Sequence, residues 1–388
     1  MAEVDWHKCR FLESVENLKP LVKRRFGREP STSVAQEITA CLQQGRLFYE
    51  AAAASPLEIR PLQLFYGMVG FAKALVVAHR LRRLSTLQHA HGISDISTGN
   101  SRIADLRVRI GSGGTFQEFN DVVAALTRVV YIDSSTTNRA VALPSDVSAT
   151  LTGIDLSFQE VLSRIPGLGA LFELTFGQEA KTEAMLLETG FHGDGHFLIR
   201  IDDPELFGDR ESLKRIVGRW RATFPFLRSW RLSSAQHGWG NSIIEFMNVH
   251  VAGLDEFSES NLVGRGGSFQ SVDALALNEA RFTLAEGLDS VAGGFSGGAS
   301  FYAISPIKDL CLSEFSLQYL ALFQLSSLVR YRPQTWTRAI SHSASSSEPA
   351  DDRSLSLIER FLDLNSGSIP DFAVKVLNPN EDRYSGVE

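Results

Sequence analysis

The chain has 388 residues, a formal net charge of −7 and 44% hydrophobic residues. This composition excludes a disordered chain, because disordered chains lack the apolar residues that form a core. The negative charge argues against attraction of the whole surface to nucleic acid or to an anionic membrane, although a local basic patch is compatible with it. The length predicts one large domain or two interlocked domains.

The cysteines and the first residues predict a cytoplasmic protein. Cys9, Cys41 and Cys311 are the three cysteines, and no CxxC pair occurs. Such a sparse, odd set is typical of reduced thiols. Residues 1–18 are charged and lack the apolar core of a signal peptide.

Helices are expected throughout the first part of the chain. Residues 1–30 predict a helix that ends near Gly27, and residues 33–54 predict a second helix that Ser31 or Ser33 can cap. Pro61 is expected to begin a third helix, because proline at the first helical position loses little hydrogen bonding. A short link between the second and third helices predicts that they run antiparallel.

The third helix, residues 61–81, is apolar on almost every side (PLQLFYGMVGFAKALVVAHRL). Its length approaches that of a membrane span, but Lys73 and two glycines favour a buried core helix, and no membrane partner is expected. Gln63, Tyr66, Gly70 and Lys73 are spaced three or four apart and therefore share one face. A buried lysine must have a partner or a function, because an unsatisfied polar group costs stability.

The middle of the chain reads as many short elements separated by turns. Residues 82–100 predict a loop, and the hairpin around QHGWGN predicts antiparallel pairing. The expected strands are 106–110, 140–143, 197–201, 230–233, 242–249 and 299–304, and the expected helices are 115–130, 156–170 and 211–223.

Helices return after Ser313, and the whole chain is predicted to be an α+β protein. Its helical core is formed by an N-terminal part, residues 1–100, and a C-terminal part, residues 306–388. The region 101–305 is expected to be an insertion that carries a mixed or antiparallel sheet. A short amphipathic helix is expected at 355–364.

The two most apolar helices, 61–81 and 314–332, are expected to pack together, because each must be covered on most faces. We expect Tyr66 and Lys73 to face Ser327, Arg330 and Tyr331 across a polar cleft. The alternative is that these groups only satisfy one another and fix the register of the helices.

Several motifs resemble the YaaC-like proteins. They are PLQLFYGMVGFAKAL in the third helix, His91-Gly92-Ile93-Ser94, FQLSSLVRYRPQTW near the C-terminus, and Trp6 followed by Phe11-Leu12-Glu13-Ser14. The resemblance follows most of the chain in order. It implies no particular activity, because this is a family of unknown function.

A weaker resemblance is to HEPN helical hairpins, carried by LFYEAAA, a break, and a helix ending in KALVVAHRL. Many HEPN proteins are metal-independent ribonucleases of bacterial toxin or phage-defence systems, and they use an Arg-x(4–6)-His motif. Arg83 and His89 have this spacing, as do Arg82 and His89. The resemblance implies that the arginine binds a phosphate while the histidine moves a proton.

Two further groups of residues have both a functional and a structural interpretation. His192, Asp194 and His196 could bind a metal, but a glycine-rich loop with solvent-facing histidines is favoured because no fourth ligand is evident, and no metal or cofactor is expected. The arginines and tryptophans of residues 215–231 could bind single-stranded nucleic acid, or could form a solvated helix with buried tryptophans.

The sequence therefore supports three functions. The first is a binding or effector protein whose pocket takes a phosphate-bearing ligand, nucleotide or RNA. Lys73 and Arg330 would bind the anion there, and His91 would make a polar contact or transfer a proton. The second is a HEPN-like ribonuclease that uses Arg83 and His89. The third is a structural subunit that binds a protein partner or a second copy of itself.

Overall fold

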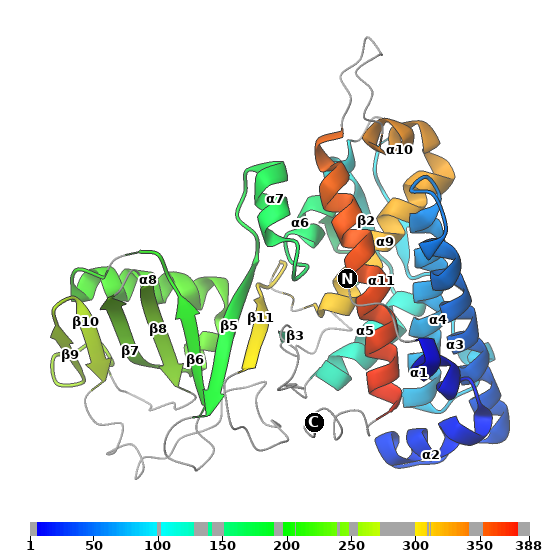
Figure 1. Cartoon of the computed structure of the whole chain (residues 1–388), viewed down its shortest axis with the longest axis horizontal. Coiled ribbons are helices and arrows are strands. Elements are labelled where there is room, and N and C mark those ends of the chain that lie inside the picture. Colours follow the sequence, from blue (N-terminus) through cyan, green and yellow to red (C-terminus); the bar gives the residue numbers. More distant parts are fainter. Residues whose placement is uncertain are drawn as a thin grey trace. The chain divides into compact units, whose positions relative to one another are not determined.

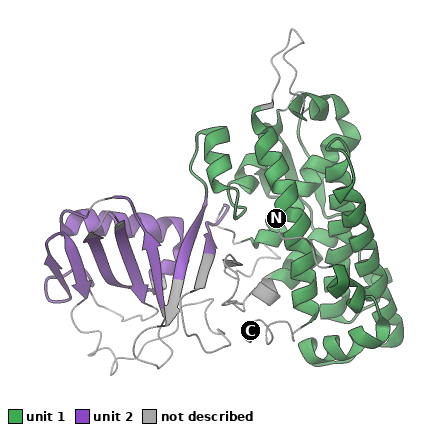
Figure 2. Ribbon diagram, viewed as in Figure 1, with its two compact units in different colours: residues 1–126, 145–180, 312–388 green, residues 127–144, 181–311 purple. Residues whose placement is uncertain are grey.

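A computed structural model of the chain describes most of its residues. They are 6–98, 102–127, 139–141, 151–189, 197–205, 207–238, 241–247, 255–271, 299–308, 310, 312–340 and 352–378. The chain forms two compact units (Figure 2). Unit 1 contains residues 1–126, 145–180 and 312–388, and unit 2 contains residues 127–144 and 181–311. The fold is α+β, as predicted.

Unit 1 is built mainly from helices (Figure 1). They are α1 (Trp6–Leu12), α2 (Val15–Phe26), α3 (Thr32–Ala53), α4 (Arg60–Arg80), α5 (Thr115–Thr127), α6 (Phe158–Leu162), α7 (Gly169–Phe176), α9 (Glu314–Tyr331), α10 (Pro333–Ile340) and α11 (Leu355–Leu377). A small antiparallel sheet has the order β1-β2-β4, with β1 (Ile93–Asp95), β2 (Arg107–Ile110) and β4 (Asp155–Ser157).

Local sequence explains where the main helices begin and end. Ser31 caps α3 by accepting a hydrogen bond from the backbone N–H of Val34 at 3.3 Å, and Ser313 caps α9 in the same way. Gly27 ends α2 in the left-handed conformation with φ of 76°, which glycine adopts without strain. Proline at position 61 lies in the first turn of α4, as predicted.

The predicted packing of α4 against α9 is confirmed. The Phe65 ring of α4 lies 5.6 Å from the rings of both Tyr319 and Phe323 of α9, measured between centroids. α4 is the one described helix long and apolar enough to cross a membrane, and 78% of its apolar window is buried inside the structure. Such burial is typical of a core helix.

α3 and α4 approach one another closely through their glycines. A Cβ atom added to Gly70 would lie 2.9 Å from the backbone nitrogen of Gly45, and one added to Gly67 would lie 2.4 Å from the Tyr49 ring. Real Cβ atoms do not approach so closely, so neither position has room for a side chain. The glycines therefore fix how near the two helices pack.

Unit 2 is an eight-stranded sheet with the order β3-β11-β5-β6-β8-β7-β10-β9, antiparallel except for the β3–β11 pair. Its strands are β3 (Arg139–Val141), β5 (Thr182–Thr189), β6 (Phe197–Asp202), β7 (Arg231–Gly238), β8 (Asn241–Met247), β9 (Leu262–Arg265), β10 (Ser268–Ser271) and β11 (Ala299–Ile304). Helix α8 (Arg210–Thr223) crosses one face (Figure 1), and the core between them includes Ile199, Trp220 and Phe246.

Five expectations about the elements need correction. The single helix expected within residues 1–30 is two helices, α1 and α2, and the loop expected over residues 82–100 contains β1 and a short 3₁₀ helix. The insertion was expected to begin at residue 101, but residues 102–126 and 151–180 belong to unit 1, since Phe116 and Phe119 pack on Tyr319. The predicted helix 156–170 is instead β4, α6 and α7, because Ser157 and Glu160 form a capping box that starts a new helix. The last helix was expected to end at residue 364, but α11 runs to Leu377 and includes Pro370.

Candidate functional site

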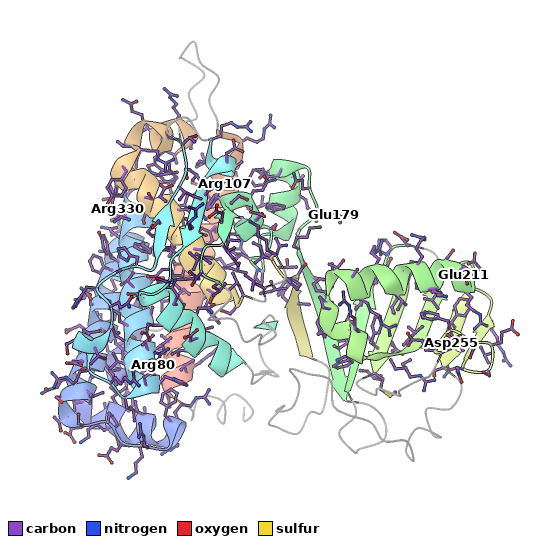
Figure 3. All side chains as sticks on the ribbon, turned by 180° about the vertical axis from the view of Figure 1, so that it is seen from behind. Arg80, Arg107, Glu179, Glu211, Asp255 and Arg330 are labelled. Atoms are coloured by element: carbon purple, nitrogen blue, oxygen red, sulfur yellow. The ribbon has the colours of Figure 1, made fainter. Side chains whose placement is uncertain are left out.

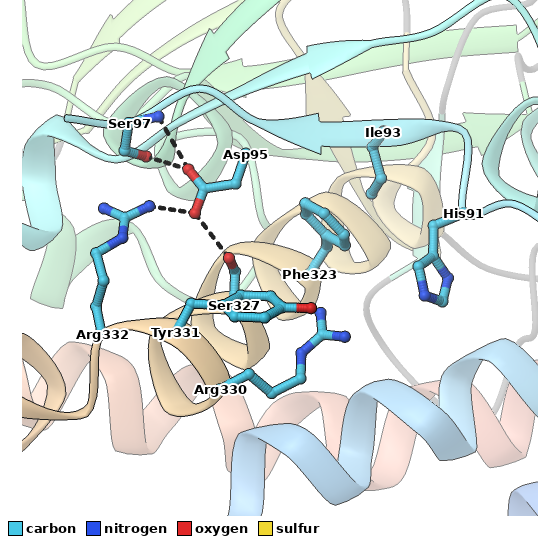
Figure 4. A pocket seen from close by; sticks show the side chains of 9 residues that line it. All are labelled: His91, Ile93, Asp95, Ser97, Phe323, Ser327, Arg330, Tyr331 and Arg332. Carbon is cyan, nitrogen blue, oxygen red and sulfur yellow. Dashed lines mark hydrogen bonds and ion pairs between the residues drawn. The ribbon is translucent and has the colours of Figure 1, made fainter. Parts of the chain in front are cut away.

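The candidate site is a pocket of about 540 Å³ in unit 1, between β1 and the end of α9. This size is within the range of roughly 300–1,000 Å³ that is usual for small-molecule sites. Figure 4 shows Asp95 and Arg332 toward one end and His91 toward the other. The lining residues are His91, Ile93, Asp95, Ser97, Phe323, Ser327, Arg330, Tyr331 and Arg332.

Asp95 uses its full capacity to accept hydrogen bonds. Its Oδ1 accepts bonds from the backbone N–H of Ser97 at 2.9 Å and from the Ser97 hydroxyl at 2.6 Å. Its Oδ2 accepts a bond from the Ser327 hydroxyl at 2.7 Å and pairs with the Arg332 guanidinium. Four donors occupy the sites that a carboxylate offers. Asp95 therefore organises the pocket wall and is not available to a ligand.

The same bonds keep Asp95 ionised. Burial alone would raise the pKa of this carboxyl, but the hydrogen bonds from Ser97, Ser327 and Arg332 lower its pKa overall. The ionised Asp95 neutralises the charge of Arg332, which also donates a hydrogen bond to the backbone carbonyl of Thr98 at 3.3 Å.

Arg330, by contrast, forms no ion pair with any residue that the structure describes. Its Nε donates to the backbone carbonyl of Ser326 at 3.3 Å, one turn earlier in α9. Its guanidinium carbon lies 5.9 Å from the centroid of the Phe65 ring and 5.0 Å from that of Tyr331. Since a guanidinium has five N–H donors, four are left for a ligand. Arg330 gives the pocket a positive charge that Asp95 does not cancel.

His91 lies beside this charge. Its ring centroid is 5.1 Å from that of Phe65 and 6.1 Å from that of Phe323. Burial lowers the pKa of His91, and the positive charges of Arg330 and Lys73 lower it further. The imidazole is therefore neutral near pH 7. Within the described part of the chain, neither ring nitrogen has a hydrogen-bond partner.

The structure brings four of the eight predicted site residues to the pocket: His91, Ser327, Arg330 and Tyr331. Lys73 does not line the pocket, but its charge acts on the pKa of His91 and on that of Cys41, so it lies near both. Lys73 has no hydrogen bond or ion pair with the residues described here. Burial raises the pKa of the Cys41 thiol to about 11, and Lys73 offsets part of this rise.

Tyr66 was expected to face α9 but does not line the pocket. Its ring packs 5.7 Å from that of Phe48 in α3, whereas the neighbouring Phe65 ring contacts Tyr319 and Phe323 of α9. Consecutive side chains of a helix point about 100° apart around its axis, so Phe65 and Tyr66 face different neighbours.

Arg83 and His89 are both exposed and outside the pocket. Arg83 Nε pairs with Glu37 Oε1 at 2.6 Å, and the other Glu37 oxygen accepts the backbone N–H of Leu84 at 2.6 Å. These contacts fasten the turn after α4 to α3, at the short 3₁₀ helix η1 (Leu84–Thr86). Arg83 therefore has a structural partner.

The sequence interpretation missed five lining residues: Ile93, Asp95, Ser97, Phe323 and Arg332. Two features of the sequence could have pointed to Asp95 and Arg332. Asp95 directly follows the His91-Gly92-Ile93-Ser94 motif, and Arg332 is the second arginine of RYRPQTW. A carboxylate beside one conspicuous motif and an extra cation in another could have been considered as an ion pair.

Outside the pocket, three of the four arginines of α8 pair with carboxylates, and the fourth, Arg210, donates to backbone carbonyls. Arg219 pairs with Asp203 at 2.5 Å, and Arg221 pairs with Glu256. Trp220 is 8% exposed and Trp230 is 1% exposed, so both tryptophans are buried, as the structural interpretation predicts. Binding of single-stranded nucleic acid by this segment stays a prediction. The described residues contain no group of three potential metal ligands, and His192, Asp194 and His196 lie outside the described residues.

The chain is an α+β protein whose helical unit carries a small pocket. One arginine of this pocket, Arg330, has no ion pair with any residue that the structure describes. A family model for YaaC-like proteins matches residues 10–377, so the chain belongs to the YaaC-like family. No curated protein and no solved structure gives a significant match. The comparisons give no support to the HEPN resemblance.

Proposed function

We propose that the pocket of unit 1 binds a phosphate-bearing ligand and that the protein is a binding or effector protein. The observation that carries the proposal is Arg330, whose guanidinium lines the pocket without a carboxylate partner among the described residues. Arginine suits this role because its planar set of donors matches phosphate oxygens.

The charges around the pocket support an anion. Asp95 is the only carboxylate among the lining residues, and its oxygens are already bonded. Ser327 donates its hydroxyl hydrogen to Asp95, and Arg332 is neutralised by it. The remaining charge is that of Arg330, with Lys73 close to His91. A cationic or neutral ligand would gain nothing from this arrangement.

His91 would contact the anion rather than catalyse a reaction. A neutral imidazole can donate one hydrogen bond to a phosphate oxygen. No carboxylate of the pocket orients the imidazole as a base, because Asp95, the carboxylate among the lining residues, is occupied by four donors. The ribonuclease function stays a prediction, because the described contacts of Arg83 are structural. The assembly function also stays a prediction.

Calorimetric titration of the full chain with inorganic pyrophosphate tests the proposal. We expect binding that weakens roughly 10- to 100-fold in Arg330→Gln, because hydrogen bonds to a charged group contribute about 1.5–3 kcal/mol each. Arg82→Gln is the matched control, since Arg82 is exposed and outside the pocket. Absence of binding, or equal loss in both variants, would contradict the proposal.

A further inference from the structure

We infer that the ligand of this pocket is a mononucleotide, with its phosphate on Arg330 and its base stacked on Tyr331. The inference rests on the proposed function and specifies the part of the ligand that is not phosphate. It is carried by the position of a highly exposed aromatic ring beside the phosphate-binding arginine.

Tyr331 is 71% exposed although it lines the pocket and ends a helix that is otherwise largely buried. Large aromatic side chains in a folded protein usually bury most of their surface. The guanidinium of Arg330 lies 5.0 Å from the Tyr331 centroid, within the range of a cation–π contact. The Arg330 guanidinium contacts one part of the Tyr331 ring, and most of the ring surface stays accessible to a planar ligand group.

The order of groups along the wall matches that of a nucleotide. The Arg330 guanidinium carbon lies 5.0 Å from the centroid of the Tyr331 ring, so one anion-binding group and one stacking surface lie side by side (Figure 4). Ile93 and Phe323 add apolar surface to the same pocket. A ligand with a phosphate and an aromatic ring uses both features, whereas inorganic phosphate or a sugar phosphate uses only the first.

The surroundings favour a mononucleotide over RNA. Proteins that bind single strands present a positively charged groove that follows the phosphate backbone. Here the arginines at the ends of α4 are neutralised locally: Arg60 pairs with Asp363 at 2.8 Å, and Arg80 pairs with Asp121 at 3.3 Å. Arg80 and Arg330 lie well apart (Figure 3), so these two arginines do not form one continuous basic track.

Calorimetric titration of the full chain with AMP, GMP and ribose 5-phosphate tests the inference. Ribose 5-phosphate carries the sugar and phosphate without a base, so it isolates the contribution of stacking. We expect AMP or GMP to bind at least about tenfold more tightly than ribose 5-phosphate, as stacking of one base on an aromatic ring provides. Tyr331→Ala should remove this difference between nucleotides and ribose 5-phosphate, and Tyr331→Phe should retain it.

The outcomes separate this inference from the proposed function. Equal affinities for nucleotides and ribose 5-phosphate, or a difference that survives in Tyr331→Ala, would overturn the nucleotide assignment while leaving the anion pocket in place. Tighter binding of a short single-stranded RNA than of both nucleotides would overturn it in favour of RNA. Failure of all these probes and of pyrophosphate would overturn both.

Discussion

Two polar regions of unit 1 differ in whether their groups have partners. At the contact of α3, α9 and α11, the Tyr49 hydroxyl donates to Asn365 Oδ1 at 2.8 Å, and Asn365 Nδ2 donates to Gln318 Oε1 at 2.8 Å. Ser368 donates to the same Gln318 oxygen at 3.0 Å. Asn365 and Gln318 are 0% exposed, so this network is closed to solvent.

The pocket has the opposite character. Arg330 and His91 form no hydrogen bond or ion pair with any described side chain, and both line the pocket. A closed network contributes to the stability of the fold, because its members would otherwise be buried and unsatisfied. An open set of donors contributes little to stability and is available to a ligand. The following changes test this division.

The largest effect is expected in the closed network. Asn365→Ala should lower the free energy of unfolding by about 2–4 kcal/mol, because it leaves the buried Tyr49 hydroxyl without its acceptor and removes one of the two donors to Gln318 Oε1. Urea denaturation measures the change. Arg330→Gln is the control and should alter the free energy of unfolding by less than about 0.5 kcal/mol. Similar losses in both variants would abolish the distinction.

An intermediate effect is expected for Asp95, which belongs to the pocket but has a full set of partners. Asp95→Asn should lower the free energy of unfolding by about 1–2 kcal/mol near pH 7. The pKa of Asp95 is lower in the folded chain, so its contribution is present above the unfolded pKa of about 3.9 and is lost as the pH falls through the folded pKa. The difference between wild type and variant should therefore shrink toward about pH 3 in urea denaturation. A constant difference over this range would contradict the assignment.

The smallest effect is expected for His91, in the pH dependence of the affinity of the pocket for an anion. Because the pKa of His91 is lowered in the free protein, an anion that favours the protonated ring should bind more tightly as the pH falls toward about 6. Sulfate is a suitable probe, since its charge does not change in this range. The gain should be about tenfold or less, and His91→Gln should be independent of pH. Retention of the pH dependence in the variant would assign it to another group.

The sequence predicted the helices of unit 1 well where apolar periodicity and caps agree. Thr32–Ala53, Arg60–Arg80 and Glu314–Tyr331 lie within two residues of the expected ranges, and the hairpin of β7 and β8 is confirmed. The course of α11 could not be predicted past residue 364, because its continuation depends on tertiary contacts such as those of Asn365 and Ser368 with Gln318.

The site was predicted only as far as single motifs allow. Arg330 and His91 were found because they lie in conspicuous segments. Their different surroundings could not be predicted: Asp95 pairs with Arg332 and leaves Arg330 free of a carboxylate among the described residues, although the two arginines are separated by a single residue. That choice depends on where β1 places Asp95, over 230 residues away along the chain.

The close approach at Gly67 of α4 links this position, through Tyr49 of α3, to Asn365 of α11. The Tyr49 ring occupies the space where a side chain at position 67 would begin, and the Tyr49 hydroxyl holds Asn365. A relative with alanine at position 67 would need a smaller residue at position 49, and the residue at position 365 would then lose one of its two hydrogen-bond partners. These three positions should therefore vary as a set, so the spacing of two helices constrains the side-chain chemistry of a third.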